Sequence, residues 1–252
     1  MSRHNLLLLA LHSLWKNPTL EDLGDTFKTP QMTISETKGR LFPILQRCLS
    51  HLVKVPTSYP RFDDGPLKGT CLVIDSTPTP IPKPSSKRDQ KLYFNFKKKG
   101  TRYAMKTQCA IGLDLRIWDV SATHPHSVHD LTVLRQSDAM EMISEEKKAL
   151  GDSAYIGEAN IITPFKKPRG RRLRRGEKLF NMQDSHVRIL VENVFKRVKD
   201  FKIISTIYRG DYHKLEEFNC IFKLVCALVN LMFEKHPLYR QKRSIKDLPD
   251  TI

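Results

Sequence analysis

The sequence predicts an α/β protein, in which helices flank a mixed β-sheet and a small helical module precedes it. Three observations support this class. Short apolar runs bounded by Gly and Pro begin after the first quarter of the chain. Segments of helical periodicity precede these runs and alternate with them toward the C-terminus. The 252 residues suffice for one main domain and a small accessory one, since a domain takes about 100–200 residues.

The overall charge favours a polyanionic partner. The chain has 43 Lys and Arg against 27 Asp and Glu, a formal charge of +16 and a pI near 9.7. Nucleic acid is the first candidate and an acidic membrane surface the second. We expect no membrane partner, because the apolar run Leu6–Leu11 is too short for a signal sequence and reads as a helix core. The stretch Phe218–Phe233 is shorter than the roughly 20 residues of a spanning helix and contains Lys223.

Cysteine usage excludes two further classes. The five cysteines are an odd number and form no Cys-x2-Cys pair, so neither a disulfide framework nor a structural zinc site is indicated. This usage is typical of a reducing compartment.

Residues 1–55 predict a helical module. Leu20–Phe27 and Met32–Leu41 read as two helices, with Pro30 in the first turn of the second and Thr29 as its cap. The arrangement resembles a helix-turn-helix, whose second helix would read DNA. The alternative is a small helical bundle that packs on the main domain without touching DNA.

A linker and three strands follow. Prolines and glycines in residues 56–69 indicate the linker. The main domain, residues 70–235, then starts with three predicted antiparallel strands: Cys71–Ile74, Tyr103–Gly112 and Leu115–Val120. The proline-rich stretch Pro78–Lys91 between the first two predicts a mobile connection.

The second half of the main domain alternates helices and strands. We expect a helix, two short strands and a long amphipathic helix in the order His129–Ile143, Lys148–Asp152, Ile161–Pro164 and Asp184–Phe201. The helix Leu215–Phe233 is expected to cover the sheet, with a dimer face as the alternative, and residues 236–252 form a basic tail. This order, with acids on the first strand, the fourth strand and a late helix, matches a ribonuclease H-like fold.

Three carboxylates suggest a metal site. Asp75 follows an apolar strand, Asp152 ends a later strand, and Glu192 lies on the long helix. Two acids at strand ends and one on a helix can converge on hard divalent cations, which prefer oxygen ligands and activate water against a phosphodiester. Arg188 and Lys199 share the helix face of Glu192, as suits a ligand beside a phosphate backbone. The alternative is an exposed helix with an ordinary Arg188–Glu192 ion pair.

Basic segments predict where DNA binds. The stretch Lys166–Lys178 holds eight cations and one acid and is expected to lie on phosphates; the alternatives are a solvated loop or a nuclear import signal. A second basic turn and a weaker strand position complete the predicted contacts. The predicted contacts are Arg171, Arg172, Arg174 and Arg175, then Lys97, Lys98 and Lys99, and finally Lys106.

Histidines at close spacing raise a zinc alternative. His124, His126 and His129 with Asp130 imitate a zinc hydrolase cluster. The further ligands of such enzymes are not evident downstream, so we disfavour this reading.

Five blocks in order resemble one family. They are Val73–Thr77, Tyr93–Lys99 with Met105–Gln108, Ser127–Asp130, Gly151–Tyr155 and Val191–Lys199. Together they resemble the DDE-type transposases of bacterial insertion sequences and their eukaryotic Harbinger-like relatives, the DDE superfamily endonucleases, over residues 70–232.

The resemblance implies a metal-dependent transposase with Asp75, Asp152 and Glu192 as catalytic metal ligands. They would hold two Mg²⁺ (or Mn²⁺) ions about 4 Å apart, which activate water for strand cleavage and then a 3′-hydroxyl for strand transfer. The family signature Tyr-x2-Arg-x3-Glu-x6-Lys is met at Arg188, Glu192 and Lys199, whereas Ser185 stands at the tyrosine.

The same resemblance makes His129 a DNA contact. It makes Asp130 either a helix-start residue or a residue that supports the metal ligands from behind.

Three functions follow from these features. The first is an active transposase, which cuts and joins DNA at transposon ends. The second is a domesticated DNA-binding or partner-binding protein without transposition, and the third is a cellular nuclease. The expected partner is DNA, with a homo-oligomer as the working form. The expected place is intracellular, on the nucleoid of a bacterium or in a eukaryotic nucleus.

Overall fold

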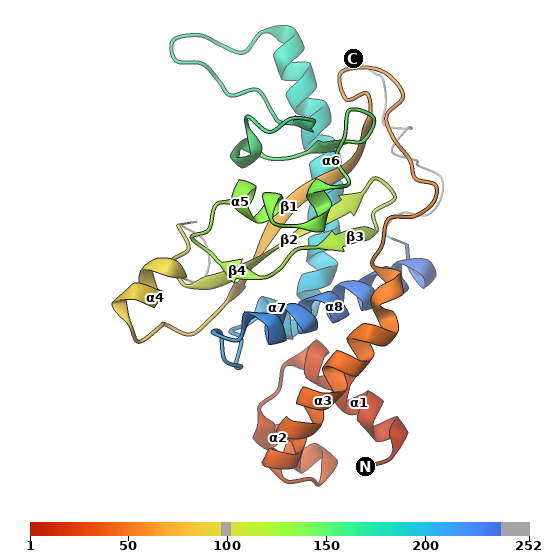
Figure 1. The fold of residues 1–252 in the computed structure, drawn as a ribbon, viewed down its shortest axis with the longest axis vertical. Helices are drawn as coiled ribbons and strands as arrows, with labels where there is room; N and C mark the ends of the chain where they lie inside the picture. Colours follow the sequence, from red (N-terminus) through yellow and green to blue (C-terminus); the bar gives the residue numbers. More distant parts are fainter. Residues whose placement is uncertain (97–101, 238–252) are drawn as a thin grey trace.

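A mixed sheet forms the centre of the molecule, with helices on both faces and three N-terminal helices at one end (Figure 1). These features come from a computed structural model that describes residues 1–96 and 102–237. The α/β class with a mixed sheet flanked by helices is confirmed. Within the described ranges, no helix is both long and apolar enough to cross a lipid bilayer.

The sheet combines antiparallel and parallel pairs. Strands β1 (Thr70–Pro80), β2 (Ala104–Gly112) and β3 (Ile117–Val120) pair antiparallel, as predicted. Strand β5 (Lys148–Leu150) then pairs parallel with β1, and β6 (Ile161–Ile162) parallel with β5. The order is β3-β2-β1-β5-β6, and the two-residue β4 (His124–Pro125) also pairs with β2.

Strand β1 is longer than predicted, and the prediction of a mobile connection over Pro78–Lys91 is wrong. Pro78 and Pro80 continue β1 opposite β2, and residues Lys87–Leu92 form the short helix α4. The next residue, Ile81, donates its backbone N–H to the Tyr103 carbonyl beside β2. Because backbone direction alternates along a strand, the backbone nitrogens of Pro78 and Pro80 point away from β2. On that edge of β1, β5 pairs only with residues up to Val73, and no other described strand pairs with Pro78 or Pro80 there. The missing proline N–H groups therefore cost no ladder hydrogen bond with a described strand.

Two hydrophobic cores lie on opposite faces of the sheet. On one face Val73 and Leu150 pack with valines of α6 (Arg175–Asp200) and with α8 (Leu215–Lys235). The short helix α7 (Lys202–Ser205) lies between α6 and α8 in the sequence and packs in the same core. The other face packs against α5 (Asp130–Arg135) and the 3-10 turns η2 (Asp138–Met140) and η3 (Ser153–Tyr155). Every residue of β2 is buried, since both faces are covered.

Two helices differ in extent from the prediction. The helix expected over His129–Ile143 ends at Arg135, because the Ser137 hydroxyl and backbone N–H both donate to the Leu134 carbonyl and divert the chain into η2. Helix α6 begins nine residues earlier than expected. The Glu177 carboxylate accepts the Arg174 backbone N–H at 2.7 Å and starts the helix inside the basic stretch.

The N-terminal module consists of α1 (Arg3–Lys16), α2 (Leu20–Phe27) and α3 (Gln31–Leu49), followed by the 3-10 turn η1 (Ser50–Leu52). One buried leucine or isoleucine from each helix forms its own small core: Leu9, Leu23 and Ile34. The helix-core prediction for Leu6–Leu11 holds only in part, since Leu7 and Leu8 are about half exposed.

The start and end of α3 correct the prediction. Pro30 is the N-cap and Thr29 caps nothing, because its hydroxyl donates to the Phe27 carbonyl. The helix also runs eight residues beyond Leu41, through Pro43.

The module packs against the main domain rather than standing apart. Ala10, Leu14 and Phe42 belong to the core shared with α6 and α8. Trp15 of α1 packs edge-on against Phe201, with ring centroids 5.0 Å apart. These contacts match the packed-bundle alternative in geometry, and DNA reading by α3 stays a prediction.

Candidate catalytic carboxylates and DNA-binding surface

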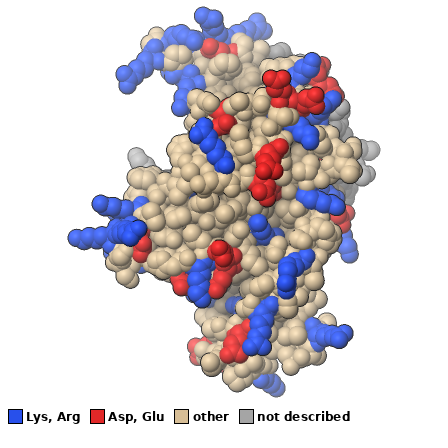
Figure 2. All heavy atoms as spheres, in the orientation of Figure 1, with Lys and Arg blue, Asp and Glu red and all other residues tan. Residues whose placement is uncertain are grey.

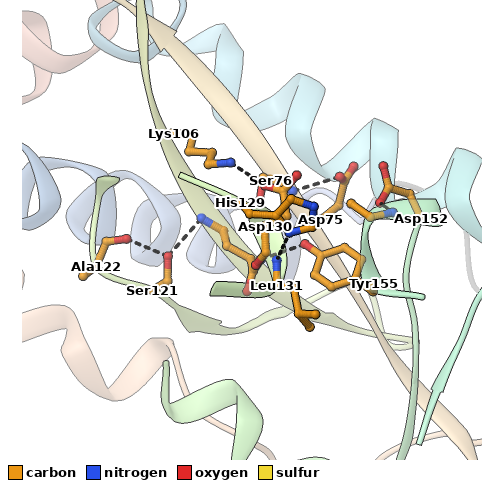
Figure 3. Close-up of polar contacts among 12 residues, drawn as sticks. Asp75, Ser76, Lys106, Ser121, Ala122, His129, Asp130, Leu131, Asp152 and Tyr155 are labelled. Carbon is orange, nitrogen blue, oxygen red and sulfur yellow. Dashed lines mark hydrogen bonds and ion pairs between the residues drawn. The ribbon is translucent and has the colours of Figure 1, made fainter. Parts of the chain in front are cut away.

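Asp75 and Asp152 lie side by side because of strand register. In the parallel pairing of β1 with β5, Val73 is opposite Leu150. Val73 and Leu150 both face α6. Asp75 lies two residues after Val73 and Asp152 two residues after Leu150, and side chains two residues apart in an extended chain point to the same side. Both aspartates therefore point to the side of the sheet that faces α6. Figure 3 shows the two carboxylates pointing to the same side, and both side chains are partly buried. The sheet thus brings together two of the three predicted ligands.

A tight turn holds Asp152 in place. Its Oδ1 accepts the backbone N–H of Ala154 at 2.8 Å and caps the turn η3. The buried ring of Tyr155 lies against Gly151, where a Cβ atom would come within 2.7 Å of the ring. Position 151 therefore requires glycine, and the aromatic ring fixes the backbone on which Asp152 stands.

Tyr155 links this turn to β2. Its hydroxyl accepts a hydrogen bond of 2.7 Å from Gln108 Nε2, which also donates to the Asp130 carbonyl at 3.1 Å. Burial raises the pKa of Tyr155 well above its usual value, and the negative charges of Asp130, Asp75 and Asp152 raise it further. The phenol therefore stays neutral beside the carboxylates and keeps its hydrogen bond with Gln108.

Asp130 begins α5 and pairs with Lys106. Lys106 Nζ lies 2.9 Å from Asp130 Oδ1, and the lysine side chain is 7% exposed. The predicted helix-start position of Asp130 is confirmed, since the exposed His129 is the N-cap and its Nδ1 accepts the Leu131 N–H. Lys106 thus has a partner inside the protein, whereas the sequence suggested a phosphate.

Glu192 is not gathered with the two aspartates. The buried face of α6 is centred near Val191. At 100° per residue, Glu192 lies about 110° around the helix axis from that centre, and its side chain is exposed. Arg188 and Lys199 are partly buried on the same side of the helix, and no ion pair joins Arg188 to Glu192 within the described part of the chain. Helix α6 nevertheless covers the sheet face on which Asp75 and Asp152 lie.

The aspartate pair fits a hard divalent cation in part. Its two carboxylates on one edge provide the oxygen donors that Mg²⁺ prefers. Across residues 1–96 and 102–237, no group of three or more His, Cys, Asp or Glu is placed to hold a metal ion. The predicted set of three, and equally the histidine cluster at residues 124–129, is therefore not assembled in this structure.

The basic stretch before α6 forms an exposed loop and the first turn of the helix. Its side chains project from the upper end of the molecule in Figure 2. Arg171 already has a partner within the protein: it forms an ion pair with Glu177 at 3.1 Å and lowers the pKa of that carboxyl. The other predicted contacts of the stretch, Arg172, Arg174 and Arg175, are exposed. Lys97, Lys98 and Lys99 lie outside the described residues.

Sequence reasoning gave no role to Gln108 and Tyr155, although each is the last residue of a block in the motif series. The available signal was local: a glycine, an acid and an aromatic residue within the five residues Gly151–Tyr155 predict a tight turn. Their hydrogen bond joins residues 47 apart and has no local signature.

Comparisons with known proteins identify the family of this chain. A family model described as DDE superfamily endonuclease matches residues 74–230, which include all three predicted ligands. A protein named "Probable transposase for insertion sequence element IS702" from Microchaete diplosiphon is 31% identical over 169 residues, 66% of this chain and 58% of that protein. "Protein ALP1-like" from Arabidopsis thaliana is 24% identical over 170 residues, 66% of this chain and 41% of that protein.

The chain thus spans less than two thirds of either relative. No solved structure matches it at a significant level. The family model covers more than half of the sequence, and it confirms the resemblance that the five blocks indicated. This chain therefore belongs to the DDE superfamily endonucleases.

Proposed function

We propose that this protein is a divalent-metal-dependent DNA endonuclease that cleaves and joins phosphodiesters at transposon ends. The observation that carries the proposal is the Asp75–Asp152 pair, set side by side by the parallel register of β1 and β5. Two adjacent carboxylates repel each other when both are charged, and a cation between them removes this repulsion. Family membership supports the same chemistry.

Asp75 and Asp152 would hold Mg²⁺ or Mn²⁺. Magnesium in phosphoryl-transfer sites is commonly bound by one or two carboxylates together with substrate phosphates. When bound, the ions supply Lewis-acid stabilisation of the phosphate and lower the pKa of a water molecule. Glu192 is the proposed third ligand, and it would need to approach the pair when α6 and DNA come together.

The protein's own residues would bind and orient the DNA. Exposed arginines of the loop before α6 bind backbone phosphates, with Arg188 and Lys199 beside Glu192 on the same helix. His129, exposed at the start of α5, would contact DNA near the carboxylates. Asp130 is proposed to support the site indirectly, through Gln108 and Tyr155.

The surroundings of such an enzyme follow from its substrate. It would act wherever the DNA lies, in a bacterial nucleoid or a eukaryotic nucleus. Pairing two element ends in one complex would require more than one copy of the chain, so we expect a homo-oligomer.

Nicking of supercoiled plasmid tests the proposal. Wild type, Asp152→Asn and Glu192→Gln are compared with Mg²⁺ or Mn²⁺ at protein concentrations that give equal DNA occupancy. We expect wild type to nick and both variants to nick at least about 100-fold more slowly, the scale of removing one electrostatic interaction from a transition state. Equal nicking by wild type and Asp152→Asn would remove the metal assignment.

The basic loop is tested separately by binding. Replacement of Arg171, Arg172, Arg174 and Arg175 with glutamine should flatten the dependence of log K on log salt by about 0.9 for each phosphate that the loop no longer neutralises. An unaltered slope would remove the loop from the interface.

The second candidate is a domesticated protein that binds DNA or a partner without transposition. Two observations favour it: Ser185 occupies the position of the family tyrosine, and Glu192 lies apart from the aspartates. Tight binding of cognate element ends without nicking by wild type would support this function over the first.

A further inference from the structure

A basic pocket lies on the helix that follows β1, away from the loop before α6. The pocket has a volume of about 510 Å³ and opens to solvent. Figure 2 shows basic side chains on the protrusion that α4 forms in Figure 1, well separated from the basic loop at the upper end. Among the described residues, the lining of the pocket contains three cations and no acid: Lys87, Arg88, Lys91, Leu92 and Ser127.

The three cations are available to an external anion. Lys87, Arg88 and Lys91 are not buried, and none makes an ion pair with a residue in the described ranges. Their spacing of one, three and four residues places them on adjoining sides of a short helix. The acid within α4, Asp89, lies 3.9 Å from His213 Nε2, on the side of the helix that faces the start of α8.

Two backbone segments lead from the pocket to the candidate catalytic edge. Ser127 donates its backbone N–H to the Leu92 carbonyl at 3.1 Å, which joins the pocket to the segment leading into α5. Two residues later that segment reaches His129, and then Asp130 with its ion pair to Lys106. On the other side, β1 runs from Asp75 toward α4. A long ligand seated on α4 can therefore continue toward Asp75 and Asp152.

We propose that this pocket binds the sugar-phosphate backbone of duplex DNA on one flank of the cleavage point. The inference rests on the proposed function and names a further DNA contact for it. Duplex DNA carries one negative charge per roughly 1.7 Å of axis, so three neighbouring cations would meet two or three phosphates. A duplex long enough to reach both the basic loop and α4 matches the two clusters in Figure 2, which a small anion would not bridge.

Binding in EDTA tests the pocket without any cleavage. The affinity of a fluorescently labelled duplex is measured between about 50 and 200 mM salt for wild type and for Lys87→Ala/Arg88→Ala/Lys91→Ala. The slope of log K against log salt should fall by about 0.9 for each phosphate released, up to about 2.7 for the three cations together.

A matched control removes the same charge elsewhere. Lys54, just before the linker, Lys68, within it, and Lys235, the last residue of α8, are exposed. Figure 1 shows the linker and the end of α8 on the opposite side of the molecule from α4. Replacement of these lysines with alanine should leave the slope within about half a contact of wild type. Melting temperatures verify folding, and if the triple variant is unstable, each single variant should still reduce the slope by about 0.9.

The outcomes separate this inference from the proposed function. A slope reduced by the α4 variant but not by the control supports the pocket, whether or not wild type nicks plasmid. An unchanged slope, an equal reduction in the control, or no duplex binding by wild type would overturn it. The α4 variant could also lose binding of inorganic pyrophosphate while its duplex binding stays intact. This result would make the pocket a small-anion site and would overturn the proposed DNA contact.

Discussion

The buried ion pair between Lys106 and Asp130 gives a stability prediction with an unequal outcome for its two partners. Lys106 is 7% exposed and Asp130 28% exposed at the side chain, and their charged atoms are 2.9 Å apart. Removing one partner of a fully buried pair costs about 3–5 kcal/mol, because the other charge stays buried alone. Asp130→Ala strands the more deeply buried partner. Since Asp130 itself is partly solvated, we expect about 2–3 kcal/mol.

The opposite substitution should cost less. Lys106→Met keeps most of the apolar stem and leaves Asp130 partly in water at the first turn of α5, where the helix dipole favours a negative charge. We expect a cost of about 0–1 kcal/mol. The double variant should be more stable than Asp130→Ala alone, because no unpaired ammonium remains inside.

Thermal unfolding measures this difference. A change of 1 kcal/mol shifts Tm by about 2–4 °C in a protein of this size, so Asp130→Ala should lower Tm by about 4–12 °C. Lys106→Met should also leave the salt slope of DNA binding unchanged, whereas removal of a phosphate ligand would reduce it by about 0.9. A Lys106→Met variant as unstable as Asp130→Ala would refute the reasoning about burial, and a flattened slope would return Lys106 to the DNA interface.

Three further predictions concern buried groups. Tyr155→Phe removes the acceptor of the Gln108 amide and should lower the free energy of unfolding by about 1 kcal/mol; denaturant titration would contradict this if the midpoint is unchanged. Gly151→Ala places a Cβ 2.7 Å from the buried Tyr155 ring and should cost about 1–3 kcal/mol, so a variant as stable as wild type would show that the turn can relax. Burial raises the pKa of Asp184, and Arg188 offsets this in part, so the native state binds more protons than the unfolded state above the unfolded pKa of about 3.9. Stability therefore falls as the pH rises from the unfolded pKa to the folded pKa of Asp184. Asp184→Asn should melt at a higher temperature than wild type at pH 7 and should lose this advantage below the unfolded pKa. An equal difference in melting temperature at both pH values would contradict the assignment.

Local signals were sufficient for the order of the main elements. Apolar alternation identified β2 and its antiparallel neighbour β3, and helical periodicity identified α8 and most of α6. Signals failed where hydrogen bonds with distant or unexpected partners decide the conformation. Pro78 and Pro80 read as a loop from composition, yet they lie in β1 because that edge of the sheet needs no proline N–H.

The candidate site divides in the same way. Side-chain chemistry and motif order led to the prediction of Asp75, Asp152 and Glu192 as ligands without any structure, since each stands in a short stretch with its own pattern. Only the parallel pairing of β1 with β5 brings together the two aspartates, which are 77 positions apart in the sequence. The hydrogen bond between Gln108 and Tyr155 and the ion pair of Lys106 with Asp130 depend equally on contacts between strands and helices distant in sequence.

By itself, the sequence determined which chemical groups are present: carboxylates in three distinct motifs, a surplus of cations, and the motif series of its family. The tertiary structure decided which of those groups share a location. It placed Asp75 beside Asp152, buried Lys106 against Asp130, left Glu192 exposed on α6 and brought Ser127 to the cations of α4. The physical reason is that residue type and spacing are local properties of the chain, whereas register and burial result from packing of the whole sheet and its helices.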